Sequence, residues 1–259
     1  MSSLDSEQIK NDNSPLIKEM FKAGVHYGYS RERRHPSISD FIFGYKNKTA
    51  IIDIEKTIDQ LTIVNDFVKD LAKAKKQILF VGNKPEARSP MERGAKSINQ
   101  PYVTLRWIGG TLTNFKEISK RLNLLASWKE KGEKGELAVY TKKERLLISK
   151  EVEELEQIFG GITNLSKLPS ALFVIDAKSE AIAIAEAKLM KIPVIAVANS
   201  DCSIDGLDYP LVANDASGSS INFFVHQIAT AYKEGLTMVP EISPTATQTT
   251  PATSGPTVI

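Results

Sequence analysis

Three short runs of consecutive apolar residues constrain the fold of this chain more than any other feature. They occupy residues 78–81, 171–175 and 192–198 and are rich in β-branched side chains. A strand that is apolar at every position is typical of a parallel sheet covered by helices on both faces. Segments with helical spacing follow the first two runs, at 85–98 and 180–190. The alternation predicts a three-layer α/β fold with right-handed crossovers.

Further elements are expected around this sheet. The patterns of apolar and turn-forming residues predict a helix over 14–24, a hairpin formed by 41–43 and 50–54, a helix over 57–73 and a last helix over 217–234. Proline lacks the backbone N–H that an interior helical position needs, so Pro90 is expected to kink or divide the helix that begins at Pro85.

Residues 111–160 interrupt the alternation of strand and helix. Apolar residues recur there with spacings of three and four, at Ile118, Leu122 and Leu125 and again at Ile148, Val152, Leu155 and Phe159. A polar segment that contains two glycines separates the two series. The pattern predicts an antiparallel helical hairpin, a coiled-coil arm inserted in the α/β body and projecting from it.

The ends of the chain differ from this body in composition. Residues 1–13 are polar and are expected to be flexible, and residues 237–259 contain seven Thr and four Pro and are expected to be a disordered tail. The body is therefore assigned to residues 14–236. A single cysteine, Cys202, indicates a reducing compartment. The absence of a secretory leader and of long apolar stretches predicts a cytoplasmic protein with no membrane contact.

Charge is divided unevenly along the chain. The net charge is only +2, but residues 1–150 hold 28 Lys+Arg against 18 Asp+Glu, whereas residues 151–259 hold 5 against 13. The basic part contains clusters that suit nucleic acid, because guanidinium groups bind phosphate bidentately and aromatic rings stack on bases. The candidate residues are Arg31, Arg33, Arg34, Arg106, Trp107, Lys116, Lys120 and Arg121. For any single lysine, an ordinary solvated surface is the simpler interpretation.

Nucleic-acid binding competes with two other interpretations of this sequence, the first of which is an enzyme. Asn83, Asp176 and Asp201 follow predicted strands, where α/β enzymes bind substrates. However, the sequence contains neither a glycine-rich phosphate loop nor a nucleophile elbow, and the spacing of Asp201, Asp205 and Asp208 fits a calcium loop poorly. We therefore predict no catalytic residues, no metal site and no cofactor. The third alternative is an interaction scaffold that uses the arm to bind proteins.

Several strings taken together resemble one family. They are AGVHYG at 23–28, FIFG at 41–44, IIDIEKT at 51–57, LFVG at 79–82, RWIGGTLTNF at 106–115, GGI at 160–162, LPSALFVID at 168–176 and DGLDYP at 205–210. In this order they resemble the family of small ribosomal subunit protein number two, in its bacterial or organellar form. The resemblance covers about residues 15–236, and the string at 106–115 is close to diagnostic.

The resemblance implies both a fold and a function. Family members have a flavodoxin-like parallel α/β body with an inserted coiled-coil arm. They are structural constituents of the small ribosomal subunit, bind its rRNA between head and body in support of translation, and are not enzymes. Neighbouring small-subunit proteins are the expected partners, and in many bacteria these include small-subunit protein number one. Lys84, which follows the LFVG string, joins the expected RNA-binding residues.

The chain departs from the family pattern at a few positions. Tyr29 stands where histidine is usual, and Arg34-His35 replaces Trp-Asn. Pro85 and Ser219 replace a lysine and an arginine, so RNA contacts through those two positions are not expected here. Arg34, in contrast, offers an additional phosphate contact.

Overall fold

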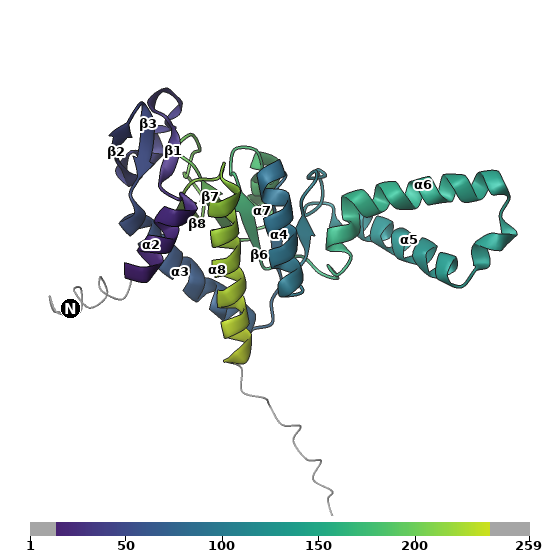
Figure 1. Ribbon diagram of the computed structural model, residues 1–259. Coiled ribbons are helices and arrows are strands. Elements are labelled where there is room, and N and C mark those ends of the chain that lie inside the picture. Colours follow the sequence, from purple (N-terminus) through teal and green to yellow (C-terminus); the bar gives the residue numbers. More distant parts are fainter. Residues whose placement is uncertain (1–13, 239–259) are drawn as a thin grey trace, which may run out of the picture.

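A computed structural model of the protein describes residues 14–238, and a five-stranded parallel sheet forms its centre (Figure 1). The strands are β4 (Ile78–Val81), β5 (Tyr102–Val103), β6 (Ala171–Ile175), β7 (Val194–Ala198) and β8 (Tyr209–Val212), in the spatial order β5-β4-β6-β7-β8. After β4 the chain adds β5 on one side and then returns to place β6 on the other. The strand order therefore reverses between β4 and β6.

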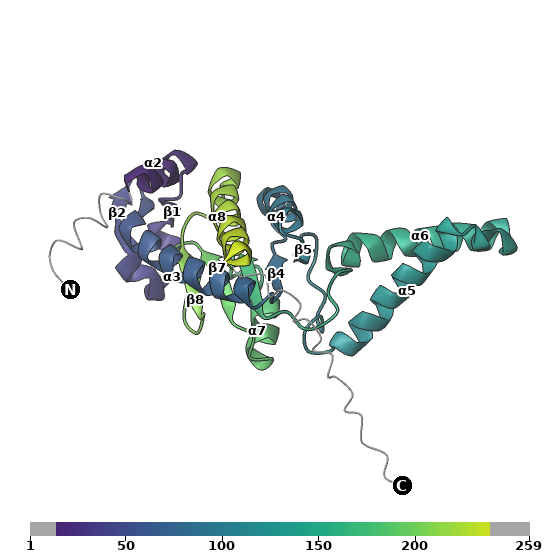
Figure 2. The same cartoon turned by 90° about the horizontal axis from the view of Figure 1, so that it is seen from below.

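Helices cover both faces of this sheet, as its apolar strands require. One face packs against α3 (Ile54–Lys73), α4 (Pro85–Ser97) and α8 (Gly218–Thr237), and α7 (Ala181–Leu189) lies on the opposite side (Figure 2). Alternate residues of β4, β6 and β7 enter the two cores, so that Phe80 and Phe173 face α8 while Leu79 and Leu172 face α7. The predicted three-layer parallel α/β fold is confirmed.

Three details differ from the sequence-based predictions. β5 contains only two residues and β8 lies where a loop was expected, because neither segment carries the uninterrupted apolar run of the central strands. Pro210 is tolerated in β8 because this strand is at the edge of the sheet. The helix α4 continues through Pro90, so its expected division is wrong. Pro90 is the sixth helical residue, and its missing N–H removes only one backbone bond.

A second, antiparallel sheet adjoins the body near the N-terminus. It follows α2 (Ser14–Ala23) and contains β1 (Tyr27–Ser30), β2 (Ile42–Lys46) and β3 (Thr49–Ile52) in the order β1-β3-β2. The β2–β3 hairpin agrees with the prediction, and β1 was not predicted. Asn47 and Lys48 both have positive φ at the hairpin tip, as a tight two-residue turn requires.

Two long helices extend from the body between β5 and β6 (Figure 1). They are α5 (Phe115–Glu133) and α6 (Lys142–Phe159), and we call them the arm. Its buried residues are Ile118, Leu122 and Leu125 on α5 and Ile148, Leu155 and Phe159 on α6. All of these except Ile148 belong to the core beneath α7, which therefore continues into the arm.

The expected flexible segment at 1–13 and nearly all of the expected tail at 237–259 lie outside the described residues, and α8 ends at Thr237. Between residues 14 and 238, no helix has the length and the apolar character needed to cross a bilayer.

Candidate nucleic-acid interface

An exposed group of arginines follows β1. Arg31, Arg33 and Arg34 lie in or next to a single 3-10 turn, and the backbone on either side of them is fixed to the body. The backbone N–H of His35 donates to the carbonyl of Ser200 at 2.8 Å, and the N–H of Arg31 donates to the carbonyl of Lys48 at 3.1 Å. The arginine heads therefore extend into solvent from a rigid base.

Tyr45 of β2, which was not predicted as a site residue, contacts two of these arginines. The guanidinium carbon of Arg31 lies 5.4 Å from the centre of the Tyr45 ring, and Nη1 of Arg34 lies 3.4 Å from its hydroxyl oxygen. Such contacts hold guanidinium planes without neutralising their charge. We call Arg31, Arg33, Arg34 and Tyr45 the arginine cluster.

A second exposed basic group lies at the root of the arm. Arg106 precedes the loop that enters α5, and Lys116, Lys120 and Arg121 lie on the first two turns of that helix. Lys120 pairs with Glu117 at 2.6 Å, but an exposed pair of this kind contributes little and leaves the amine accessible. We call these four residues the arm-root group.

The predicted RNA-binding residues do not form one patch. The arginine cluster belongs to the small antiparallel sheet at one end of the molecule, and the arm-root group begins at the opposite side of the parallel sheet (Figure 1). A single ligand that touches both groups must be large and must extend past the body.

Two predicted RNA-binding residues are not available to RNA in this structure. The ring of Trp107 is buried, with 7% of the residue exposed, and its Nε1 donates to Glu186 at 3.0 Å. The amine of Lys84 lies between two carboxylates, at 2.8 Å from Asp176 and 2.7 Å from Asp215. Both side chains therefore use their polar groups on partners inside the protein, which the sequence could not show, and neither is retained among the proposed RNA contacts.

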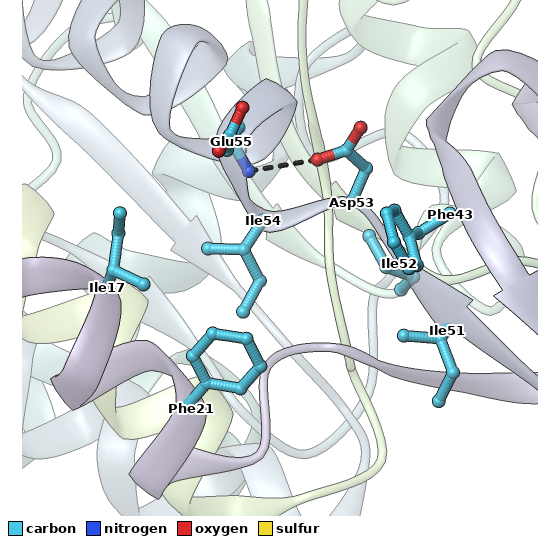
Figure 3. A pocket seen from close by; sticks show the side chains of 8 residues that line it. All are labelled: Ile17, Phe21, Phe43, Ile51, Ile52, Asp53, Ile54 and Glu55. Carbon is cyan, nitrogen blue, oxygen red and sulfur yellow. Dashed lines mark hydrogen bonds between the residues drawn. The ribbon is translucent and has the colours of Figure 1, made fainter. Parts of the chain in front are cut away.

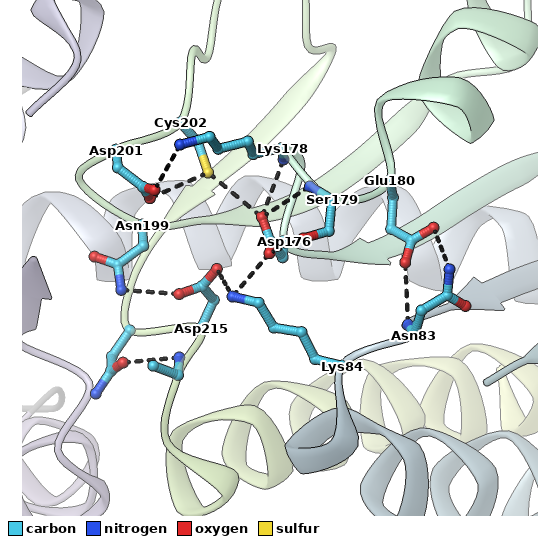
Figure 4. A network of polar contacts seen from close by, with 12 residues as sticks. Asn83, Lys84, Asp176, Lys178, Ser179, Glu180, Asn199, Asp201, Cys202 and Asp215 are labelled. Atoms are coloured by element: carbon cyan, nitrogen blue, oxygen red, sulfur yellow. Dashed lines mark hydrogen bonds and ion pairs between the residues drawn. The ribbon is translucent and has the colours of Figure 1, made fainter. Parts of the chain in front are cut away.

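Lys84 is the centre of a polar network at the carboxyl ends of β4 and β6 (Figure 4). This is the position where the strand order reverses and where doubly wound folds usually bind ligands. Ser179 donates its hydroxyl to Asp176, and Asn199 donates its side-chain amide to Asp215 at 2.9 Å. Asp176 adopts a left-handed backbone conformation, with φ of +68°.

Burial and the ion pairs of this network act in opposite directions on the pKa values of its members. Burial opposes ionisation of Asp176, but donation from Lys84 and Ser179 holds the pKa of Asp176 below its usual value. Burial raises the pKa of Asp215, against the effects of Lys84 and Asn199. Despite the cost of burial, the two carboxylates raise the pKa of Lys84, so that its amine stays protonated.

The remaining polar groups at these strand ends are also engaged with one another. Asn83 donates from its backbone and its side chain to Glu180, at 3.0 and 3.1 Å. Burial and the nearby carboxylates raise the pKa of Cys202 to about 12, which leaves it an unreactive thiol. Asp176, Cys202 and Asp215 lie close enough to share a metal ion, but the amine of Lys84 already binds both carboxylates. Most polar groups of this network therefore have partners within the protein, whereas Oδ1 of Asn83 is buried without one.

The acidic loop weighed as a calcium site is likewise occupied by protein contacts. Asp201 pairs with Lys178 at 3.2 Å, and Asp208 accepts a hydrogen bond from the backbone of Val194 at 3.0 Å. The carboxylates of the loop therefore point to different partners.

An apolar groove lies between α2 and the small sheet (Figure 3). It has a volume of about 360 Å³, and Phe21 and Phe43 are its most exposed aromatic residues, at 52% and 81%. Asp53 and Glu55 supply acidic groups at its edge. Its chemistry suits an apolar protein side chain better than it suits RNA.

Comparison with known proteins places the chain in one family. The family model for ribosomal protein S2 matches residues 20–235. Small ribosomal subunit protein uS2 of Helicobacter hepaticus and that of Wolinella succinogenes are each 38% identical to this chain over 85% of its length, which corresponds to 83% and 81% of those proteins. The uS2 protein of Nitratiruptor sp. is 40% identical over the same share of this chain and over 82% of its own. This chain belongs to the ribosomal protein S2 family.

Proposed function

We propose that this protein is a structural constituent of the small ribosomal subunit that binds small-subunit rRNA between head and body. The observation that carries the proposal is the arginine cluster, which presents three guanidinium groups from a fixed turn in a member of this family. Phosphate contacts of this kind supply affinity and position with little reading of sequence. The arm-root group provides a second contact at a distance from the first.

The proposal excludes catalysis. Where a doubly wound enzyme binds its substrate, this chain holds Lys84 between two buried carboxylates and Asn83 against Glu180. Substitution of Asn83 by alanine should therefore leave subunit assembly largely intact. Saturable binding of a nucleotide or phosphosugar to the isolated protein, abolished by that substitution, would favour an enzyme instead.

The proposed protein partners are neighbours on the small subunit, with small-subunit protein number one among them. The groove of Figure 3 supports this, because its exposed aromatic residues suit the apolar side chain of a neighbouring protein. As a ribosomal component, the protein would reside on ribosomes in the cytoplasm.

Sedimentation of a lysate tests the proposal. The protein should migrate with small subunits and should resist a high-salt wash better than a loosely bound factor does. Migration only in the soluble fraction of growing cells would contradict it.

A further inference from the structure

The buried carboxylate of Glu186 serves neither the arginine cluster nor the Lys84 network. Glu186 is the one acidic residue of helix α7, whose other residues are apolar except for Lys188, and it is 7% exposed. Five donors converge on it. Oε1 accepts from Nε1 of Trp107 at 3.0 Å and from the N–H of Gly110 at 2.8 Å. Oε2 accepts from the N–H of Leu112 at 3.0 Å and from the N–H and hydroxyl of Thr113, both at 3.2 Å.

This arrangement requires an ionised carboxylate. A carboxylate only accepts hydrogen bonds and has about four lone-pair sites, which suits several converging donors. Gly110 has φ of +91°, and its loop directs the backbone N–H groups of Gly110, Leu112 and Thr113 toward one point, as in the concave sites that bind anions. A glutamine of the same shape would turn an NH₂ group toward donors on at least one side.

The loop held by Glu186 leads directly into the arm. It lies between Arg106 and Lys116, two members of the arm-root group, and α5 begins at Phe115. The helix that carries Glu186 is fixed to the body, since Ala183 and Ala187 are buried against the parallel sheet. Glu186 therefore connects the first arm helix to the body through polar contacts.

The other end of the arm packs closely on the body and is also hydrogen-bonded to it, through Asn164 to Gln77 and Asn99. Phe159 and Ile162 are buried where α6 ends, and a Cβ placed on Gly161 would lie 2.2 Å from the carbonyl oxygen of Tyr102. Close packing fixes how near this end lies to the body. The entering loop packs into the same core through Trp107 and Leu112, but its glycines make no comparable backbone contact with the sheet. The five hydrogen bonds to Glu186 therefore add the directional contacts that fix the backbone of this loop.

We propose that Glu186 is a positioning residue that sets the direction of the arm and so presents the arm-root group to rRNA. The positional part concerns the protein alone, whereas the RNA part rests on the proposed function. The two parts are separable by experiment, because the direction of the arm can be measured without RNA.

Distances between spin labels on the full chain provide the measurement. Labels at Ile63→Cys on α3 and Ala126→Cys on α5 use exposed positions, and native Cys202 is buried. In Glu186→Gln, the distance distribution should broaden or shift relative to the parent protein. Glu153→Gln removes the same charge from an exposed site on α6 and should leave the distribution unchanged. An unaltered distribution in folded Glu186→Gln would overturn the positional claim.

Thr113→Val keeps the test decisive if Glu186→Gln does not fold. It deletes one donor to the carboxylate and leaves the charge in place, so a smaller broadening is expected. Trp107→Phe likewise deletes one donor to Glu186. If both variants show the same spin-label distance distribution as the parent protein, the positional claim is overturned.

Binding to a small-subunit rRNA fragment then tests the RNA part. Glu186→Gln should bind at least several-fold more weakly than Glu153→Gln at the same salt concentration. A displaced arm with unchanged affinity would refute the role of the arm-root group and leave the positional claim intact. Weaker binding with an undisplaced arm would refute positioning.

Discussion

Lys84 shows how a single side chain can decide the stability of the body. Its amine pairs with two carboxylates whose side chains are only 6% and 1% exposed. Lys84→Met would leave both of them without a cation and should lower the free energy of unfolding by about 3–5 kcal/mol. Urea denaturation measures this change, and Lys150→Met at an exposed position should stay within about 0.5 kcal/mol of the parent protein. A similar small loss for both variants would show that the network contributes little.

The hydrogen bonds to Glu186 predict that the stability of the protein depends on pH. Burial alone would raise the pKa of its carboxyl group, but the hydrogen bonds from Trp107, Gly110, Leu112 and Thr113 hold this pKa below its usual value. Its stabilising contribution should therefore be present above the unfolded pKa of about 4.3 and be lost as the pH falls through the folded pKa. Glu186→Gln should be less stable than the parent protein by about 2 kcal/mol or more at pH 7. The difference should narrow as the pH falls below the unfolded pKa and should close below the folded pKa. Urea denaturation over this pH range checks it, and a gap that stays constant would contradict the assigned hydrogen bonds.

For single residues, the residue type predicted solvent exposure better than it predicted hydrogen-bond and ion-pair partners. Arg31, Arg33 and Arg34 are exposed, as a run of arginines suggests. Lys84 and Trp107 are less exposed, because Lys84 pairs with Asp215 and Trp107 with Glu186, which lie 131 and 79 residues away in the chain. A lone glutamate in an apolar helix was the available indication of Glu186, but only the fold shows which donors it receives.

The arm is an element whose apolar seam can be tested directly. Leu122 is 7% exposed on the side of α5 that meets α6, whereas Leu124 is 38% exposed. Leu122→Asp would bury a charge without a partner and should destabilise the arm by several kcal/mol, about 2–4 kcal/mol by the lower estimates for buried polar groups. Leu124→Asp should have little effect. Hydrogen exchange of the amides of α5 and α6 compares the two variants, and equal protection in both would contradict the seam.

Elements were predictable in proportion to their length and regularity. The spacing of Ile118, Leu122 and Leu125 pointed to the residues that are buried on α5, and the apolar runs pointed to β4, β6 and β7. The short strands β5 and β8 were missed because pairing with β4 and β7, not their own pattern, makes them strands. Likewise, Pro90 is accommodated by packing of α4 against the body, which local propensity does not include.

Across the molecule as a whole, the arginine cluster and the arm-root group are the two surfaces proposed to contact RNA. They are separated by the parallel sheet, whereas the acidic half of the chain supplies β6, α7, β7, β8 and α8 (Figure 1). The charge asymmetry was visible in the sequence. The separation of its basic part into two groups was not, because it depends on where the arm and the small sheet join the body.

Contact between the arginine cluster and rRNA phosphates can be measured through the salt dependence of binding. Each phosphate contact releases condensed counterions, so it adds about 0.7–0.9 to the slope of log affinity against log salt concentration. The measurement is this slope for a small-subunit rRNA fragment, with the parent protein, Arg33→Ala/Arg34→Ala and the control Lys167→Ala/Lys188→Ala from the acidic half. We predict weaker binding and a slope flatter by about two units for the arginine pair, with little change for the control. An unchanged slope and affinity for the arginine pair would show that the arginine cluster does not face RNA.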